Sequence, residues 1–265
     1  MLTGHSMKKI LLRSLIVLAL ACACALGIFW AMGKPGLWEF EISAYEKADR
    51  LSPPKPGVIV FTGSSSIRIW DTLADDMKPL EVINRGFGGS QIADVNRYAS
   101  RIILPYRPRA VVLYAGDNDL SAPWLKTPEQ VSEDFKHFVQ IIRGKLPETW
   151  IYFVSIKPSI QRWSNWPKFK KTNALIAEYI HTQPRVEFID VGPAMLDAQG
   201  KPRAELFRED GLHMNAKGYA VWTSTIKPVL LSRFANPKLD ATVYSVLATG
   251  SLPSPPQTHH PSATQ

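Results

Sequence analysis

Short apolar segments alternate with longer segments of helical periodicity along most of this chain. Residues 110–115 are apolar throughout, and residues 58–62 are apolar or β-branched, as strands buried on both faces are. Further segments of this kind lie at residues 80–84, 150–156 and 186–191. Since short connections separate them from the helical segments, the pattern predicts a parallel sheet covered by helices on both faces.

The segments between these strands predict helices. The clearest helix begins after Thr127, because Thr127 and Gln130 can form a capping box and Pro128 suits the first helical position. Other helices are expected at residues 37–51, 92–103, 169–180 and from 215 onward, the last one bent or ended near Pro228. With 265 residues, 45% of them hydrophobic, the chain can build one such domain with a substantial core.

The N-terminal segment predicts export. Lys8, Lys9 and Arg13 precede an uncharged, mostly apolar run at residues 14–32, and about 20 such residues can cross a bilayer. The positive flank predicts a cytoplasmic N-terminus, with the remainder of the chain outside. We therefore expect an uncleaved signal anchor in residues 1–34 and a location in the bacterial cell envelope. The alternative is a signal peptide, whose cleavage would release a secreted protein.

Charge and cysteine content exclude several classes of protein. The net charge is +8, but the basic residues are scattered and form no nucleic-acid-binding pattern, so no nucleic acid partner is expected. Cys22 and Cys24 both lie in the apolar run, so the domain expected at residues 35–235 has neither a disulfide nor a thiolate nucleophile. Residues 236–265 mix proline with Ser, Thr and His and predict a disordered tail.

A glycine and three serines follow the first predicted strand. Gly63 ends the apolar segment, and Ser64, Ser65 and Ser66 come next. A sharp turn from strand to helix can hold a hydroxyl at the carboxyl edge of the sheet, beside the N–H groups of the following helix. Open α/β sheets place their functional sites at this edge. One of the three serines is therefore a candidate nucleophile.

Later motifs supply the groups that a serine nucleophile needs. His213 can accept and return the serine proton. Asp210, three residues earlier, can bind the other ring nitrogen and select the tautomer. Negative charge that develops on a substrate oxygen needs N–H donors. The candidates are the backbone N–H groups of Ser65 and Gly89 and the side-chain amide of Asn118.

Taken together, these motifs resemble those of the SGNH or GDSL-type esterases and lipases. The resemblance spans residues 57 to about 231 and rests on the motifs at residues 63–66, 84–89, 116–119 and 210–213. It implies a flavodoxin-like three-layer α/β/α sandwich with a five-stranded parallel sheet, the SGNH hydrolase fold. It also implies that neither a metal nor an organic cofactor is needed.

The resemblance assigns a role to each candidate residue. Ser65 corresponds to the nucleophile, His213 to the base and Asp210 to the acid that orients it. Ser65, Gly89 and Asn118 correspond to the oxyanion hole. Gly88 is the near alternative to Gly89. Many members of the family carry Asp where this chain has Ser64, which leaves Ser64 and Ser66 as residues that could be mistaken for the nucleophile.

The expected activity is hydrolysis of carboxylic esters through an acyl-enzyme. The alternatives are an O-deacetylase or O-acyltransferase that acts on polysaccharides of the cell envelope, and a non-catalytic binding module with the same fold. Expected partners are a small-molecule or glycan ester and, through the N-terminal segment, the membrane. Trp163 and Trp166 follow the fourth predicted strand, where they could stack on a sugar, line an acyl pocket or pack beneath the loop.

Overall fold

The computed structural model describes residues 36–121 and 125–235. At its centre lies a five-stranded parallel sheet with the order β2-β1-β3-β4-β5. The strands are β1 (Ile59–Gly63), β2 (Val82–Gly86), β3 (Ala110–Tyr114), β4 (Trp150–Val154) and β5 (Val186–Ile189). This is the flavodoxin-like strand order. The predicted strands and the predicted three-layer fold are confirmed.

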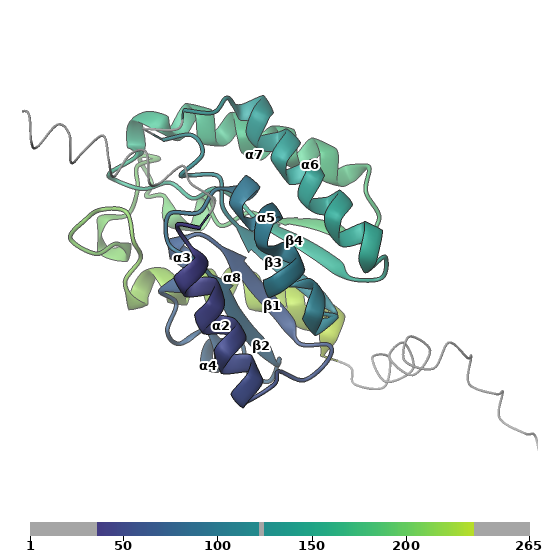
Figure 1. Cartoon of the computed structure of the whole chain (residues 1–265). Coiled ribbons are helices and arrows are strands. Elements are labelled where there is room, and N and C mark those ends of the chain that lie inside the picture. The colour runs from purple at the N-terminus through teal and green to yellow at the C-terminus, as the bar shows by residue number, and fades with distance from the viewer. Residues whose placement is uncertain (1–35, 122–124, 236–265) are drawn as a thin grey trace, which may run out of the picture.

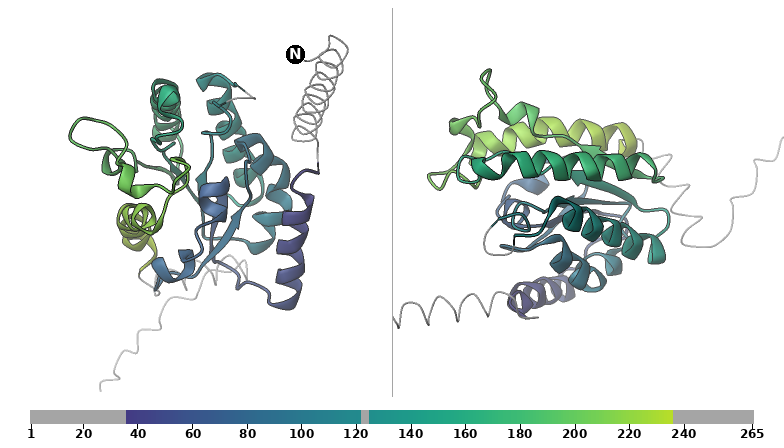
Figure 2. Two further views of the ribbon diagram at one scale, coloured as in Figure 1. Left: turned by 90° about the vertical axis from the view of Figure 1, so that its left-hand side faces the viewer. Right: turned by 90° about the horizontal axis from the view of Figure 1, so that it is seen from above.

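Helices cover both faces of the sheet (Figure 1). One face is covered by α2 (Glu39–Leu51), α5 (Ile92–Ile102), α6 (Pro128–Lys145) and α7 (Trp166–His181). The other face is covered by α8 (Ala216–Phe234) and the short helices α3 (Ser65–Arg68) and α4 (Leu73–Asp76). The left view of Figure 2 shows α2 and α8 on opposite sides of the sheet.

Side chains along β1 alternate between the two cores. Val60 belongs to the core beneath α2, α5, α6 and α7, whereas Ile59 and Phe61 belong to the core beneath α8. All of these side chains are fully buried. A strand buried on both faces must be apolar at consecutive positions, and for this reason the strands appear in the sequence as short apolar runs.

The capping residues begin the helices where the sequence predicts. Thr127 and Gln130 form the expected capping box at the start of α6, with Pro128 at the first helical position. Asn215 caps α8, where its side chain accepts hydrogen bonds from the N–H groups of Lys217 and Gly218. These caps satisfy N–H groups that have no partner within their own helix.

Helix α8 continues past Pro228, where the sequence predicts a bend or an end, and ends at Phe234. A proline removes one helical hydrogen bond and favours a kink or an end. Here Ile226, Leu230 and Phe234 remain buried on either side of Pro228. Burial of this apolar face therefore outweighs the local cost of the proline.

The two terminal segments lie outside the described residues. These are the predicted anchor in residues 1–34 and the predicted tail in residues 236–265. Among the helices of the described ranges, none is long and apolar enough to cross a membrane. The predicted domain boundaries and the predicted topology stay predictions.

Candidate active site

Strand β1 brings the serine turn to the carboxyl edge of the sheet. Gly63 has a φ of +124°, and a Cβ at this position would lie 1.8 Å from the carbonyl oxygen of Tyr114. Only glycine fits at this approach of β1 to β3. The N–H of Ser64 donates to the same Tyr114 oxygen over 2.9 Å. The chain then turns into α3, whose first residue is Ser65.

The three serines have different surroundings. Ser64 and Ser66 are buried, with exposed fractions of 1% and 2%, whereas Ser65 is half-buried. The Oγ of Ser65 lies 2.9 Å from Nε2 of His213. The carbonyl oxygen of Ser66 accepts a hydrogen bond from Tyr219 and helps to seat α3 against α8. Ser65 is thus the serine whose hydroxyl contacts the candidate base.

Asp210 holds the other side of the His213 ring. Its Oδ2 lies 2.6 Å from Nδ1 of His213, and its Oδ1 accepts the backbone N–H groups of Leu212 and His213, each over 2.9 Å. Burial by itself would raise the pKa of Asp210, but these hydrogen bonds outweigh burial and hold the pKa at about 2. Asp210 is therefore a carboxylate at neutral pH and can accept a hydrogen bond from the N–H at Nδ1 of the ring.

The backbone N–H groups of the two candidate glycines differ in their partners. The N–H of Gly88 donates to Oε2 of Glu41 over 3.2 Å, so it is engaged. The N–H of Gly89 has no hydrogen-bond partner within residues 36–121 and 125–235. Gly89 has a φ of +73°, and a Cβ there would meet no atom within 4 Å. The free N–H favours Gly89 over Gly88 as the oxyanion donor.

Asn118 has its amide orientation set by neighbours. Its Nδ2 donates to the carbonyl oxygen of Ser90 over 3.0 Å, and its Oδ1 accepts a hydrogen bond from Arg162 over 2.9 Å. Arg162 also forms an ion pair with Asp117 over 2.9 Å. A guanidinium can only donate, so its bond to Oδ1 assigns oxygen and nitrogen of the amide. One N–H of Asn118 remains for a substrate oxygen. The sequence motifs did not single out Arg162.

A buried lysine supports the loop that carries Asp210 and His213. Lys157 is 1% exposed, and its ammonium group donates to the carbonyl oxygen of Leu212 over 3.0 Å. Burial lowers the pKa of Lys157 to about 8, even though the carboxylates of Asp117 and Asp210 oppose the shift. No motif in the sequence singles out this lysine, since its partner is a backbone atom distant in the chain.

The aspartates on either side of Asn118 are engaged within the protein. Asp119 is fully buried, and its Oδ1 lies 3.3 Å from the N–H of Ile92 and 3.3 Å from Nζ of Lys126. Burial raises the pKa of Asp119 to about 7. Asp117 pairs with Arg162. Within the described ranges, no group of three or more His, Cys, Asp or Glu side chains is arranged to hold a metal ion.

The predicted aromatic residues near the site contact each other. Trp163 and Trp166 are stacked with ring centroids 5.9 Å apart, and the ammonium group of Lys201 lies 5.2 Å from the Trp163 ring. Asp190 closes a loop, since its Oδ1 accepts hydrogen bonds from Ser155 and from the N–H of Gly192. Trp166 also packs against the hydrophobic core, so packing is part of the role of this tryptophan.

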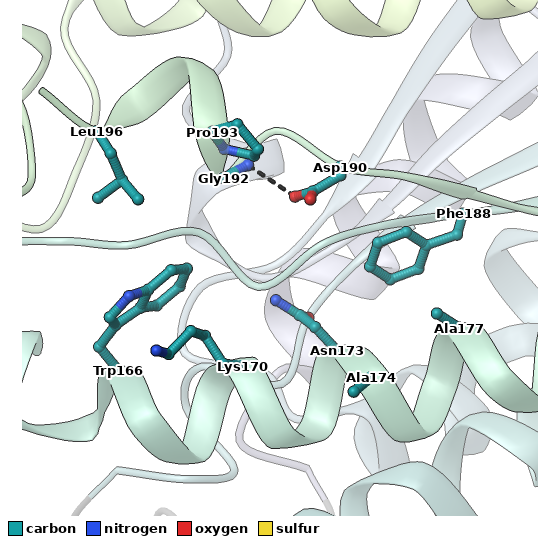
Figure 3. A pocket seen from close by; sticks show the side chains of 10 residues that line it. All are labelled: Trp166, Lys170, Asn173, Ala174, Ala177, Phe188, Asp190, Gly192, Pro193 and Leu196. Atoms are coloured by element: carbon teal, nitrogen blue, oxygen red, sulfur yellow. Dashed lines mark hydrogen bonds between the residues drawn. The ribbon is translucent and has the colours of Figure 1, made fainter. Parts of the chain in front are cut away.

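A separate cavity of about 380 Å³ lies between α7 and the segment that follows β5 (Figure 3). Its walls are mainly apolar, with Trp166, Phe188 and Leu196 among them. Two of its polar residues have partners within the protein: Asn173 pairs with the backbone of Ile156, and Asp190 accepts the N–H of Gly192. None of the candidate catalytic residues lines this cavity.

Comparison with known families decides the class of the protein. Residues 57–221 match the sequence model of the GDSL-like Lipase/Acylhydrolase family. The chain belongs to this family. This GDSL-like acylhydrolase is accordingly a hydrolase that acts on esters. Among curated proteins, none matches the chain.

Solved structures share the fold of this GDSL-like acylhydrolase. A Streptococcus pneumonia protein named for platelet activating factor is 21% identical, with a TM-score of 0.67 over 79% of this chain and 99% of its own. A GDSL-like lipase from Bacteroides thetaiotaomicron is 18% identical, with a TM-score of 0.62 over 72% and 97%. A carbohydrate esterase of family 3 from Talaromyces cellulolyticus is 19% identical, with a TM-score of 0.54 over 66% and 97%.

Proposed function

We propose that this acylhydrolase is a serine esterase that cleaves carboxylic esters through an acyl-enzyme on Ser65. One observation carries the proposal. The His213 ring lies between Ser65 and Asp210, with Nε2 2.9 Å from the serine Oγ and Nδ1 2.6 Å from the Asp210 carboxylate. A serine hydroxyl becomes a useful nucleophile only when a base in this position removes its proton, and the acid keeps that base in the required tautomer.

Each proton in the reaction passes through His213. Ser65 Oγ attacks the acyl carbon while its proton moves to Nε2 of His213. The tetrahedral intermediate then collapses, and Nε2 gives the proton to the departing alcohol oxygen. A water molecule attacks the acyl-enzyme, loses a proton to Nε2 and releases the carboxylic acid, after which the proton returns to Ser65. Asp210 stays ionised throughout and stabilises the transient imidazolium.

The intermediate's oxygen anion is bound by three donors in this proposal. These are the backbone N–H groups of Ser65 and Gly89 and the remaining amide hydrogen of Asn118. The unpartnered N–H of Gly89 and the orientation that Arg162 imposes on the Asn118 amide support this assignment. Losing one such donor typically costs about 10²- to 10³-fold in rate.

A polysaccharide ester is the second candidate substrate. One observation favours it: the stacked pair of Trp163 and Trp166 follows directly after Arg162, which contacts Asn118. Aromatic rings are suited to stacking on sugar rings, and both tryptophans are partly exposed. One similar structure is a carbohydrate esterase and another is an acetyl esterase. O-deacetylation, or transfer of the acyl group to a sugar hydroxyl in place of water, would use the same residues.

We also propose that the ester substrate is met outside the cytoplasm. The support is the basic flank of Lys8, Lys9 and Arg13 before the apolar run at residues 14–32. An alkaline phosphatase fused after Ala235 is expected to be active in intact cells. An inactive fusion, with the fusion protein present, contradicts this topology.

Hydrolysis of p-nitrophenyl esters tests the catalytic proposal. We would assay the full chain in mild detergent with acyl groups of increasing length, beside Ser65→Ala and the matched control Ser64→Ala. Hydrolysis should disappear in Ser65→Ala and persist in Ser64→Ala, because the Ser64 hydroxyl makes no contact with His213. Hydrolysis that persists in Ser65→Ala contradicts the proposal.

The substrate class needs a separate comparison. Faster acetate release from acetylated glycans than from simple esters would favour the polysaccharide ester, and transfer of the acyl group to an added sugar would favour an acyltransferase.

A further inference from the structure

Helix α2 and its N-cap Trp38 contact the turn that carries Gly89, although they precede the family match, which begins at residue 57. This turn joins β2 to α5. Besides the glycine at 89 it contains Phe87 and Gly88. Helix α2 contains none of the sequence motifs of the candidate site, so its contacts with the turn could not be predicted from those motifs.

Trp38 holds the carbonyl oxygen of Gly88. The indole Nε1 donates to this oxygen over 2.6 Å. The indole ring also meets the Phe87 ring edge to face, with centroids 5.7 Å apart. Trp38 is only 8% exposed, so loss of its donor would leave the carbonyl group without a partner in a largely dry environment.

Glu41 connects the same turn to the helix that begins with Ser65. Its Oε2 accepts the N–H of Gly88 over 3.2 Å. Its Oε1 forms an ion pair with Nε of Arg68, which lies in α3 three residues after Ser65. The Glu41 side chain is 25% exposed, so its contacts are partly shielded from water. One carboxylate therefore bridges the two segments that supply the backbone donors of the oxyanion hole.

The relative position of these two segments matters for catalysis. Oxyanion donors act when they lie about 2.7–3.1 Å from the developing charge. A displacement of about 1 Å at a reacting centre can reduce the rate about 10²-fold. Since Ser65 and Gly89 come from different connections, their spacing depends on side chains that tie the connections together.

We propose that Trp38 and Glu41 are positioning residues that set the spacing between the N–H groups of Ser65 and Gly89. The inference rests on the proposed function, because it assumes that these two groups bind the oxyanion. Neither residue donates to the substrate. Their effect is exerted through the backbone of Gly88 and through Arg68.

Three substitutions separate positioning from packing. Trp38→Phe removes the indole donor but keeps an aromatic ring against Phe87, and Glu41→Ala removes both carboxylate contacts. We expect each to lower kcat at least about 10-fold, with KM changed by less than about twofold. Glu41→Gln keeps an oxygen that can accept the Gly88 N–H and should recover part of the loss. All variants are made in the full chain.

Glu46→Gln is the matched control. Glu46 also lies in α2 and also pairs with an arginine, but its partner is Arg101 of α5 rather than the turn. This variant should keep a kcat within about twofold of the wild type, since surface ion pairs contribute little. Trp38→Phe should lower the thermal unfolding midpoint, since it leaves the Gly88 carbonyl oxygen without a partner, whereas Glu41→Ala and Glu46→Gln should keep midpoints close to that of the wild type. The kinetic constants are measured below all of these midpoints.

Affinity for a trifluoromethyl ketone supplies a readout that a purely structural role would not change. Such a ketone forms a tetrahedral oxyanion with the nucleophile, so its inhibition constant measures oxyanion binding. The constant should rise in Trp38→Phe and Glu41→Ala by the same factor by which kcat/KM falls, and not in Glu46→Gln. A fall in kcat with an unchanged inhibition constant overturns the inference, as does activity equal to that of Glu46→Gln. If instead Ser65→Ala keeps wild-type hydrolysis, it is the proposed function that fails.

Discussion

The ammonium group of Lys157 donates a hydrogen bond to the backbone carbonyl oxygen of Leu212 over 3.0 Å. Leu212 immediately precedes His213, so this bond ties the loop of Asp210 and His213 to the segment that follows β4. The rings of Tyr114 and Phe207 lie 5.7 and 5.9 Å from the Lys157 nitrogen. A cation so deeply buried is costly unless it is well paired, which indicates that its contact with the loop is important.

Replacement of Lys157 by Met should slow catalysis. The variant keeps a long apolar side chain but leaves the Leu212 carbonyl without its donor, so the loop that carries His213 can shift. We expect kcat for a p-nitrophenyl ester to fall about 10-fold or more. Steady-state kinetics measure the effect. Lys201→Met, which alters an exposed lysine beside Trp163, is the control and should leave kcat nearly unchanged; equal kcat values for both variants would contradict the expectation.

Lys157 should also give the stability a specific pH dependence. Burial lowers its pKa from 10.5 to about 8. Between these two pH values the unfolded chain binds more protons than the folded chain, so stability rises with pH. The cost of burying the charge is fully present below pH 8 and is relieved above it. The unfolding midpoint of the wild type, minus that of Lys157→Met, should therefore increase from pH 8 to pH 10. A difference in midpoint that stays constant from pH 8 to pH 10 would show that the Lys157 ammonium group does not titrate in this range.

Substitutions of Asn118 and Arg162 should have non-additive effects on kcat. Asn118→Ala removes a proposed oxyanion donor and is expected to lower kcat about 10²- to 10³-fold. Arg162→Leu leaves the donor but removes one of the two contacts that orient the amide, so a smaller loss of about 10-fold is expected. The double variant should be no worse than Asn118→Ala alone, because the arginine acts through the amide. Fully additive losses of activation free energy would show that Arg162 has another role.

Gly63 should tolerate no side chain. A Cβ would lie 1.8 Å from the Tyr114 carbonyl oxygen at a residue with a φ of +124°, so Gly63→Ala should destabilise the fold by on the order of 3 kcal/mol or more. Gly144→Ala is the matched control: Gly144 lies within α6, and a Cβ there would meet nothing within 4 Å. The control should gain up to about 1 kcal/mol from helix propensity. Urea unfolding compares them, and equal stabilities would refute the steric argument.

The sequence by itself determined the layers of the protein and the approximate ends of its elements. Strands buried on both faces require consecutive apolar residues, and this local requirement is visible in the chain at residues 58–62 and 110–115. Capping chemistry is equally local, as Thr127 and Gln130 illustrate. The Asp-x-x-His spacing likewise sufficed to predict that Asp210 and His213 contact each other, because the two residues lie on one short loop.

Only the tertiary structure decided which polar groups of the candidate site form hydrogen bonds within the protein and which remain free to bind a substrate. Gly88 and Gly89 are indistinguishable by type, but Glu41, 47 residues away in the chain, engages the N–H of Gly88, whereas the N–H of Gly89 has no partner within residues 36–121 and 125–235. The contacts of Arg162 with Asn118 and of Lys157 with Leu212 span 44 and 55 residues. Such contacts obey no local periodicity, since they depend on where separate elements meet. The same holds for Pro228, where burial of the helix face overrides a local preference to end.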